Sequence, residues 1–239
     1  MGNSLKTFRA PHLAKLQTLD SFTVLSGSYF RVANELRAMA SETERSRWPS
    51  HFYVFPAITM YIAAFEAFLK EHLALSLHKA NHAQIQKSND IERINKLIDN
   101  SHVNFKDWVK DLFCLYDSMN VGINTTCDEY HNLIALKELR NSIVHYTPSF
   151  IDAAIWPARL EQALHKNKLE VMNSGWVTYF SRVEVANWAH DSVRGAIELF
   201  CSISGAENPF TTTEADGILN WEWVGPILAS QPTSTGKKD

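Results

Sequence analysis

The chain has 239 residues, of which 45% are hydrophobic and 21% are charged, so it can bury a sizeable core in a single domain. Its formal net charge of -3 excludes a global positive field that would hold a long polyanion by phosphate contacts alone. Its three cysteines, Cys114, Cys127 and Cys201, are too few and too scattered for a disulfide framework, which favours a reducing, cytoplasmic location.

Helical periodicity dominates the sequence, and the first clear amphipathic stretch follows an N-terminal segment, residues 1–27. From about Ser28 to Arg47, apolar side chains recur at helical spacing among charged ones, which predicts a helix that ends before Trp48. The most apolar part of the chain comes next. It predicts a second helix that begins between Pro49 and Pro56 and runs to about Lys79.

This second helix contains a stretch of membrane-crossing length, Phe52 to Leu69. The stretch is nearly all apolar, but it contains Pro56, Thr59 and Glu66. A carboxylate near the middle of a lone membrane span is costly. We therefore predict a buried helix at the centre of the bundle and no membrane partner.

Shorter helices are expected in the middle of the chain. A short amphipathic helix is predicted through Ile91 to Ile98 and another over Lys106 to Met119, before Val121 to Asn124 break the pattern. Thr126 to Glu129 then has the spacing of a capping box, in which a hydroxyl and a carboxylate satisfy free backbone N–H groups. The next helix is therefore expected from Thr126 to Tyr146.

Prolines and a glycine interrupt residues 147–180, so one short helix is expected there, near Ala158 to His165. A second capping box, at Ser181 to Glu184, opens the last long amphipathic helix, which should stop at Gly205. The sequence thus predicts an all-α fold, an up-and-down helical bundle of four to six helices. This helical domain covers residues 28–205, followed by an irregular packed extension over 206–230 and a disordered tail over 231–239.

One charged residue lies on the apolar stripe of the helix expected to begin at Thr126. Arg140 shares its helical face with Leu133, Leu136, Ile143 and Val144. A guanidinium cannot shed its charge, so it needs a carboxylate, a phosphate or a subunit interface to meet. Asn141 and His145 lie one turn apart on an adjoining face, so three polar groups converge at one end of one helix.

The run from Leu136 to His145 resembles the signature of the HEPN superfamily, which is an Arg, a polar residue directly after it and a His four to six residues after the Arg. The apolar stretch Ile62 to Leu69 is similar to the second helix of many HEPN proteins. Trp176 to Ser181, leading into a capped helix, is also similar to them. The resemblance spans about Phe30 to Ile203, and Arg140, Asn141 and His145 are its chemically informative part.

The resemblance implies a metal-independent endoribonuclease that needs no cofactor and builds a composite site across a homodimer. It also implies a role as a toxin or defence effector, with an antitoxin or regulatory protein as a further partner beside the RNA substrate. The 2′-hydroxyl would attack the adjacent phosphorus and leave a 2′,3′-cyclic phosphate and a free 5′-hydroxyl. His145 would transfer the proton, Arg140 would stabilise the phosphate, and Asn141 would orient the phosphate or the imidazole.

Each of these roles has a structural alternative. Arg140 could pair with Glu66 and fasten two helices together, or Glu66 could orient Arg140 within an active site. His145 could be an ordinary histidine at a helix C-terminus, stabilised there by the helix dipole. The rival function is a catalytically silent helical module that forms a dimer or binds a partner protein through the same surface.

Overall fold

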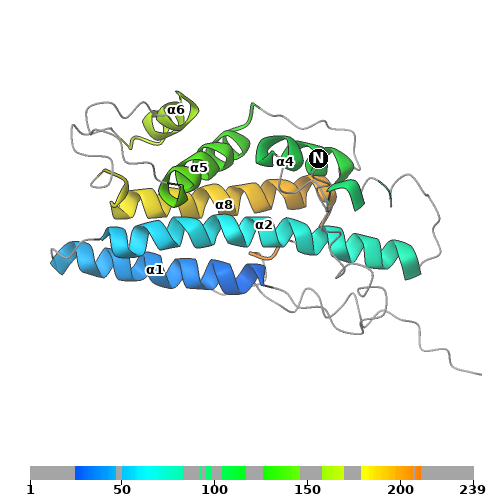
Figure 1. The fold of residues 1–239 in the computed structure, drawn as a ribbon, viewed down its shortest axis with the longest axis horizontal. Helices are drawn as coiled ribbons and strands as arrows, with labels where there is room; N and C mark the ends of the chain where they lie inside the picture. Colours follow the sequence, from blue (N-terminus) through cyan, green and yellow to red (C-terminus); the bar gives the residue numbers. More distant parts are fainter. Residues whose placement is uncertain are drawn as a thin grey trace, which may run out of the picture.

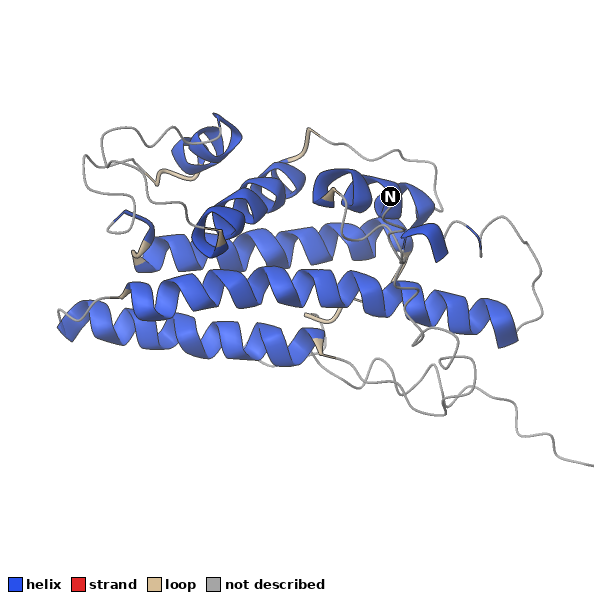
Figure 2. Cartoon of the chain, viewed as in Figure 1, coloured by secondary structure: helices blue, strands red, loops and turns tan. Residues whose placement is uncertain are grey.

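The computed structural model describes residues 25–46, 50–82, 92, 95–97, 104–116, 126–145, 158–169, 179–206 and 208–210. Helix is the regular structure throughout this described part (Figure 2), which confirms the all-α class. Its helices are α1 (Ser26–Ser46), α2 (His51–His82), α4 (Phe105–Tyr116), α5 (Asp128–Val144), α6 (Ala158–Lys166) and α8 (Val183–Ser204). The break predicted at 121–124, most of the extension at 206–230 and the tail at 231–239 lie outside the described residues.

The three longest helices, α1, α2 and α8, lie side by side and contact one another, and α5 crosses over α2 and α8 (Figure 1). The apolar sequence of α2 fits this central place, because α2 contacts α1, α5 and α8. Phe200 of α8 lies at the centre of the core, with its ring against Phe68 of α2 and against Phe113 and Tyr116 of α4. The predicted buried central helix is confirmed.

Among the described residues, one stretch, Phe52–Leu75, is long and apolar enough to cross a membrane by length and composition. Half of its most apolar window is buried inside the protein. Its position in the bundle core therefore accounts for its composition without a membrane. No disulfide joins the three cysteines, all of which fall within the described part of the chain.

Both predicted capping boxes are wrong by one residue. The N-cap of α5 is Cys127 where Thr126 was expected, and the N-cap of α8 is Arg182 where Ser181 was expected. The S/T-x-x-E spacing therefore marked the right region but not the right residue. Neither helix has a side-chain bond from its N-cap residue, but acidic side chains in the first turn of each helix interact favourably with the helix dipole.

Several other boundaries lie within a residue of the predicted ones, whereas α2 ends three residues after the expected Lys79 and α4 three before the expected Met119. Helix α1 ends at Ser46, next to the expected Arg47, and α6 ends at Lys166, next to the expected His165. Helix α8 ends at Ser204, and its C-cap residue Gly205 has a φ of 69° in the left-handed region that favours glycine. These helix ends therefore follow from the backbone preferences of residues that are close to them in the sequence.

A buried carboxylate fixes the N-terminus of α1 to α2. The Glu71 side chain accepts hydrogen bonds from the backbone N–H of Leu25 at 2.6 Å, from the backbone N–H of Ser26 at 3.0 Å and from the Ser26 hydroxyl at 2.6 Å. These bonds satisfy donors that the first turn of a helix leaves unpaired. Burial nevertheless raises the pKa of Glu71, because it disfavours the charged form more than these three donors favour it.

Candidate functional site

Arg140 lies where α5 leaves the core. Leu136, one turn before it, is fully buried, whereas Val144, one turn after it, is 47% exposed. Arg140 itself is partly buried. The predicted apolar stripe is therefore covered on its N-terminal side only, and the arginine marks its edge.

Within the described residues, the Arg140 side chain bonds its sequence neighbour and no carboxylate. Its Nη1 donates to Oδ1 of Asn141 at 3.1 Å. Its Nε is buried and has no hydrogen-bond partner within the described part of the chain. An arginine held in this way keeps most of its donors available for an anion.

The sequence left open a pairing of Arg140 with a carboxylate such as Glu66, and the structure gives Glu66 another partner. The Glu66 carboxylate of α2 instead forms an ion pair with Lys137 of α5, whose side chain is 15% exposed and whose ammonium lies 4.8 Å from the centre of the Phe105 ring. Lys137 lies one turn before Arg140, on the part of α5 that faces α2. It therefore neutralises the carboxylate, and Arg140 is left without this partner.

A second ion pair, which the sequence did not reveal, joins α5 to α6. Nη1 of Arg159 lies 3.4 Å from Oε1 of Glu138, and both side chains are about two-thirds buried. Oε2 of Glu138 is buried and has no hydrogen-bond partner among the described residues. This pair holds α6 against the polar face of α5 that continues to Asn141 one turn later.

His145 is the C-cap of α5, and its side chain is exposed. Its backbone N–H donates to the carbonyl oxygen of Asn141 at 2.9 Å. Asn141 therefore contacts Arg140 through its side chain and His145 through its backbone. The three predicted site residues therefore lie at one helix end, where the Arg140 and Asn141 side chains are bonded to each other and the imidazole of His145 is open to solvent.

A cavity of about 480 Å³ lies elsewhere, between the N-terminal half of α5, α8 and the chain that follows α6. The carboxylates of four residues line it, Asp128, Glu129, Glu184 and Asp191. Several side-chain amides and the positively charged Lys168 also line the cavity. Carboxylates repel phosphate oxygens, so this cavity does not suit an RNA backbone.

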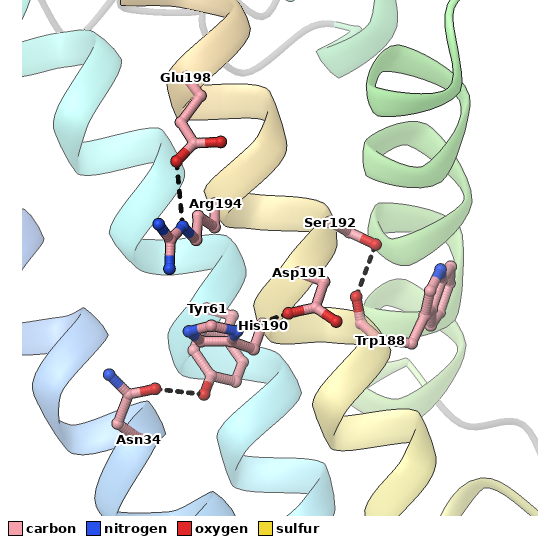
Figure 3. Close-up of polar contacts among 8 residues, drawn as sticks. All are labelled: Asn34, Tyr61, Trp188, His190, Asp191, Ser192, Arg194 and Glu198. Carbon is pink, nitrogen blue, oxygen red and sulfur yellow. Dashed lines mark hydrogen bonds and ion pairs between the residues drawn. The ribbon is translucent and has the colours of Figure 1, made fainter. Parts of the chain in front are cut away.

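Sequence reasoning missed a polar cluster around His190 in the middle of α8. The His190 ring contacts Phe30 of α1 and Tyr61 of α2, and its Nδ1 lies 2.8 Å from Oδ1 of Asp191 (Figure 3). A signal was present, because His190 lies four residues after Ala186 and three before Val193, both of which are buried. Arg140 was selected as a polar residue on the apolar stripe of a helix, and the same criterion would have selected His190.

Comparisons with known proteins add no relative: no protein-family model, no curated protein and no solved structure matches this chain. The resemblance to the HEPN superfamily therefore stays a prediction. It depends on Arg140, Asn141 and His145 and on the geometry just described.

Proposed function

We propose that this chain is a metal-independent endoribonuclease of the HEPN type whose chemistry is carried by the C-terminal end of α5. The observation that carries this proposal is the bond from Arg140 to Asn141, made by an arginine that has no carboxylate partner in the described part of the chain. The structural role considered for Arg140 was an ion pair with a carboxylate such as Glu66, and Glu66 pairs with Lys137. An arginine free of carboxylates beside an exposed histidine suits phosphate chemistry.

In the proposed reaction, the imidazole of His145 accepts the proton of the RNA 2′-hydroxyl as that oxygen attacks the adjacent phosphorus. The bond from phosphorus to the 5′-oxygen breaks, and the 5′-oxygen leaves with a proton supplied by the second histidine of a dimeric site. Arg140 stabilises the negative charge that builds on the phosphate oxygens. Asn141 holds the guanidinium in place through the 3.1 Å bond.

A homodimer completes the proposed site. Val144 is 47% exposed and lies one turn from Arg140, so the end of α5 offers an apolar contact beside the charged group. Two copies meeting here would place two histidines on one phosphate. We further propose a cytoplasmic toxin or defence effector held in check by an antitoxin or another regulatory protein, a role that only the resemblance supports.

The test is incubation of the purified protein with a mixed RNA pool in excess EDTA, followed by analysis of the RNA ends. The wild type should leave 2′,3′-cyclic phosphates, and Arg140→Ala and His145→Ala should not. His131→Ala is the matched control, because His131 is also exposed on α5 and lies outside the site. The three variants should have the same circular dichroism as the wild type.

Two results would contradict the proposal. Cleavage that persists in both Arg140→Ala and His145→Ala would assign the activity to another site or to a contaminant. Absence of cleavage by a folded wild-type dimer, together with loss of the dimer in the two variants, would favour the catalytically silent binding module.

A further inference from the structure

Exposed apolar side chains recur along α1 at a regular spacing. Leu25, Val32 and Met39 are 45%, 43% and 49% exposed. They are three of the five large hydrophobic side chains that are exposed in the described part of the chain, and the other two, Phe52 and Val144, lie on α2 and α5. Single exposed hydrophobic residues are common on protein surfaces. Three at intervals of seven residues instead form a row on one helix face.

Two further apolar side chains complete this row. Tyr29 and Leu36 lie four residues after Leu25 and Val32, and both are partly buried against the core. Steps of four and three residues then alternate along the row, which is the spacing of the contact positions in a coiled coil. We call this row the α1 seam; it consists of Leu25, Tyr29, Val32, Leu36, Met39 and Thr43.

The α1 seam is distinct from the stripe by which α1 joins the bundle. That stripe includes the fully buried Phe30, Ala33 and Ala40, and the Phe30 ring contacts aromatic rings of α2 and α8. Helix α1 thus lies at the edge of the bundle with this side inward (Figure 1). Each of these three residues directly follows a seam residue, so the two rows are about 100° apart around the helix. A surface helix needs one apolar stripe to join its own fold, and α1 carries a second one.

The two borders of the α1 seam differ. An ion pair lies along one border, where Nε of Arg31 is 3.2 Å from Oε1 of Glu35 and the two side chains are 66% and 62% exposed. Ala33 and Ala40 lie along the other border and are buried in the fold of the chain itself. The seam therefore has one charged border that is open to solvent and one border that the protein covers. Charges beside a coiled-coil seam set the choice and the orientation of the partner.

We propose that the α1 seam binds the α1 seam of a second copy of this chain, with the two helices antiparallel. A two-fold axis at the level of Asn34 then sets every seam position opposite another seam position, as a contact between identical surfaces requires. The pairs are Leu25 with Thr43, Tyr29 with Met39, and Val32 with Leu36. The inference does not rest on the chemistry assigned to α5.

The charged border selects the antiparallel orientation. In that orientation the charged borders of the two copies face each other, and Glu35 of one copy lies about 3 Å along the helix axis from the level of Arg31 of the other. The border then holds two positive and two negative charges, so its charge is balanced. A parallel pairing would set these charges against the covered border of the second helix, where Ala33 and Ala40 are buried.

The first test is sedimentation equilibrium of the full chain from about 1 to 100 μM. The wild type should self-associate, and Val32→Glu should weaken the α1 contact about a hundredfold, because a two-fold interface buries the new charge twice. Val144→Glu is the matched control, since it makes the same change at a residue of similar exposure, 47%, at the end of α5. It should leave the α1 contact intact. Both variants should keep the circular dichroism of the wild type.

The two variants also separate this inference from the dimer proposed at the end of α5. Association of Val32→Glu as strong as that of the wild type would overturn the inference, and loss of association in Val144→Glu only would then assign the dimer to α5. A wild type that stays monomeric over the whole concentration range would also overturn it, because the seam would then belong to a different partner.

A second test exchanges the charges of the open border. Arg31→Glu and Glu35→Arg each give a border of one sign, so each variant by itself should associate about tenfold more weakly than the wild type. Mixing the two variants should restore association, because two glutamates then face two arginines across the interface. No recovery in the mixture would overturn the antiparallel contact.

The matched control for the mixture is the ion pair on α8. Arg194 and Glu198 have the same spacing as Arg31 and Glu35 and are 43% and 41% exposed. Arg194→Glu and Glu198→Arg should therefore associate like the wild type, both separately and when mixed. Weakening and recovery of the same size with the α8 pair would show that the effect is not specific to the α1 seam and would overturn the inference.

Discussion

Arg140 and His190 each interrupt an apolar helix face, and the fold treats the two side chains differently. Arg140 lies at the end of α5, between buried Leu136 and exposed Val144. His190 lies in the middle of α8, between aromatic rings from α1 and α2. A polar group at a helix end can reach solvent or a substrate without help, whereas one in mid-helix depends on partners that other helices bring to it.

This difference separates stability from function. Substitutions among the neighbours of His190 remove buried contacts, so they should lower the free energy of unfolding. Substitutions of the exposed residues Val144 and His145 at the end of α5 remove few buried contacts, so they should leave stability nearly unchanged. Measurements of unfolding and of its pH dependence test this difference.

The largest expected effect on stability is at Phe30, which is fully buried and contacts His190, Tyr61 and Phe210 at centroid distances of 5.4 to 5.5 Å. Phe30→Ala should lower the free energy of unfolding by about 3–5 kcal/mol. Val144→Ala at the end of α5 should change it by less than about 0.5 kcal/mol. Urea unfolding measures both, and equal losses would show that the two regions do not differ.

A smaller effect on the free energy of unfolding is expected from the ion pair between Lys137 and Glu66. A double-mutant cycle with Lys137→Met and Glu66→Gln should give a coupling of about 1–2 kcal/mol, because the pair is largely buried. The parallel cycle with Arg140→Met and Glu66→Gln should give a coupling near zero. A larger coupling in the second cycle would restore the structural role for Arg140.

The pH dependence of stability distinguishes His190 from the exposed histidines. Burial lowers the pKa of His190 from 6.5 in the folded chain. Just below pH 6.5 the His190 ring is therefore more often protonated in the unfolded chain than in the folded chain. The free energy of unfolding should therefore fall as the pH drops below 6.5, by at most about 1.4 kcal/mol per pH unit.

Subtracting the curve of His190→Gln from that of the wild type isolates this contribution. The subtraction also removes the opposite contribution of Glu71, whose raised pKa favours the folded state as the pH falls. His131→Gln should keep the wild-type slope. A slope that is absent from the wild type would mean that the His190 ring accepts its proton freely in the folded state.

The fold was largely predictable, because hydrophobic periodicity depends on nearby residues. The central position of α2 follows from its apolar sequence, and the end of α8 follows from the backbone freedom of Gly205. The helix starts were not predictable to the residue. A shift of one position moves the N-cap from Thr126 to Cys127 without changing which residues face the core.

The candidate site was predictable where its contacts are local. Arg140, Asn141 and His145 lie within one helix end, so their proximity follows from helix geometry. The pairing of Glu66 was not predictable, because it depends on which turn of α5 faces α2. The contact between the Phe30 and His190 rings requires α1 and α8 to be placed next to each other, which only the tertiary structure shows.

The most direct test of the account compares His145→Ala with His190→Ala in single-turnover cleavage of one RNA that the wild type cuts. The account predicts that His145→Ala slows cleavage by a factor of about 10² to 10⁴, the range for loss of a general acid or base, and that His190→Ala stays within a few-fold of the wild type. Wild-type rates in His145→Ala, combined with a large loss in a folded His190→Ala, would place the chemistry on α8 and contradict the account.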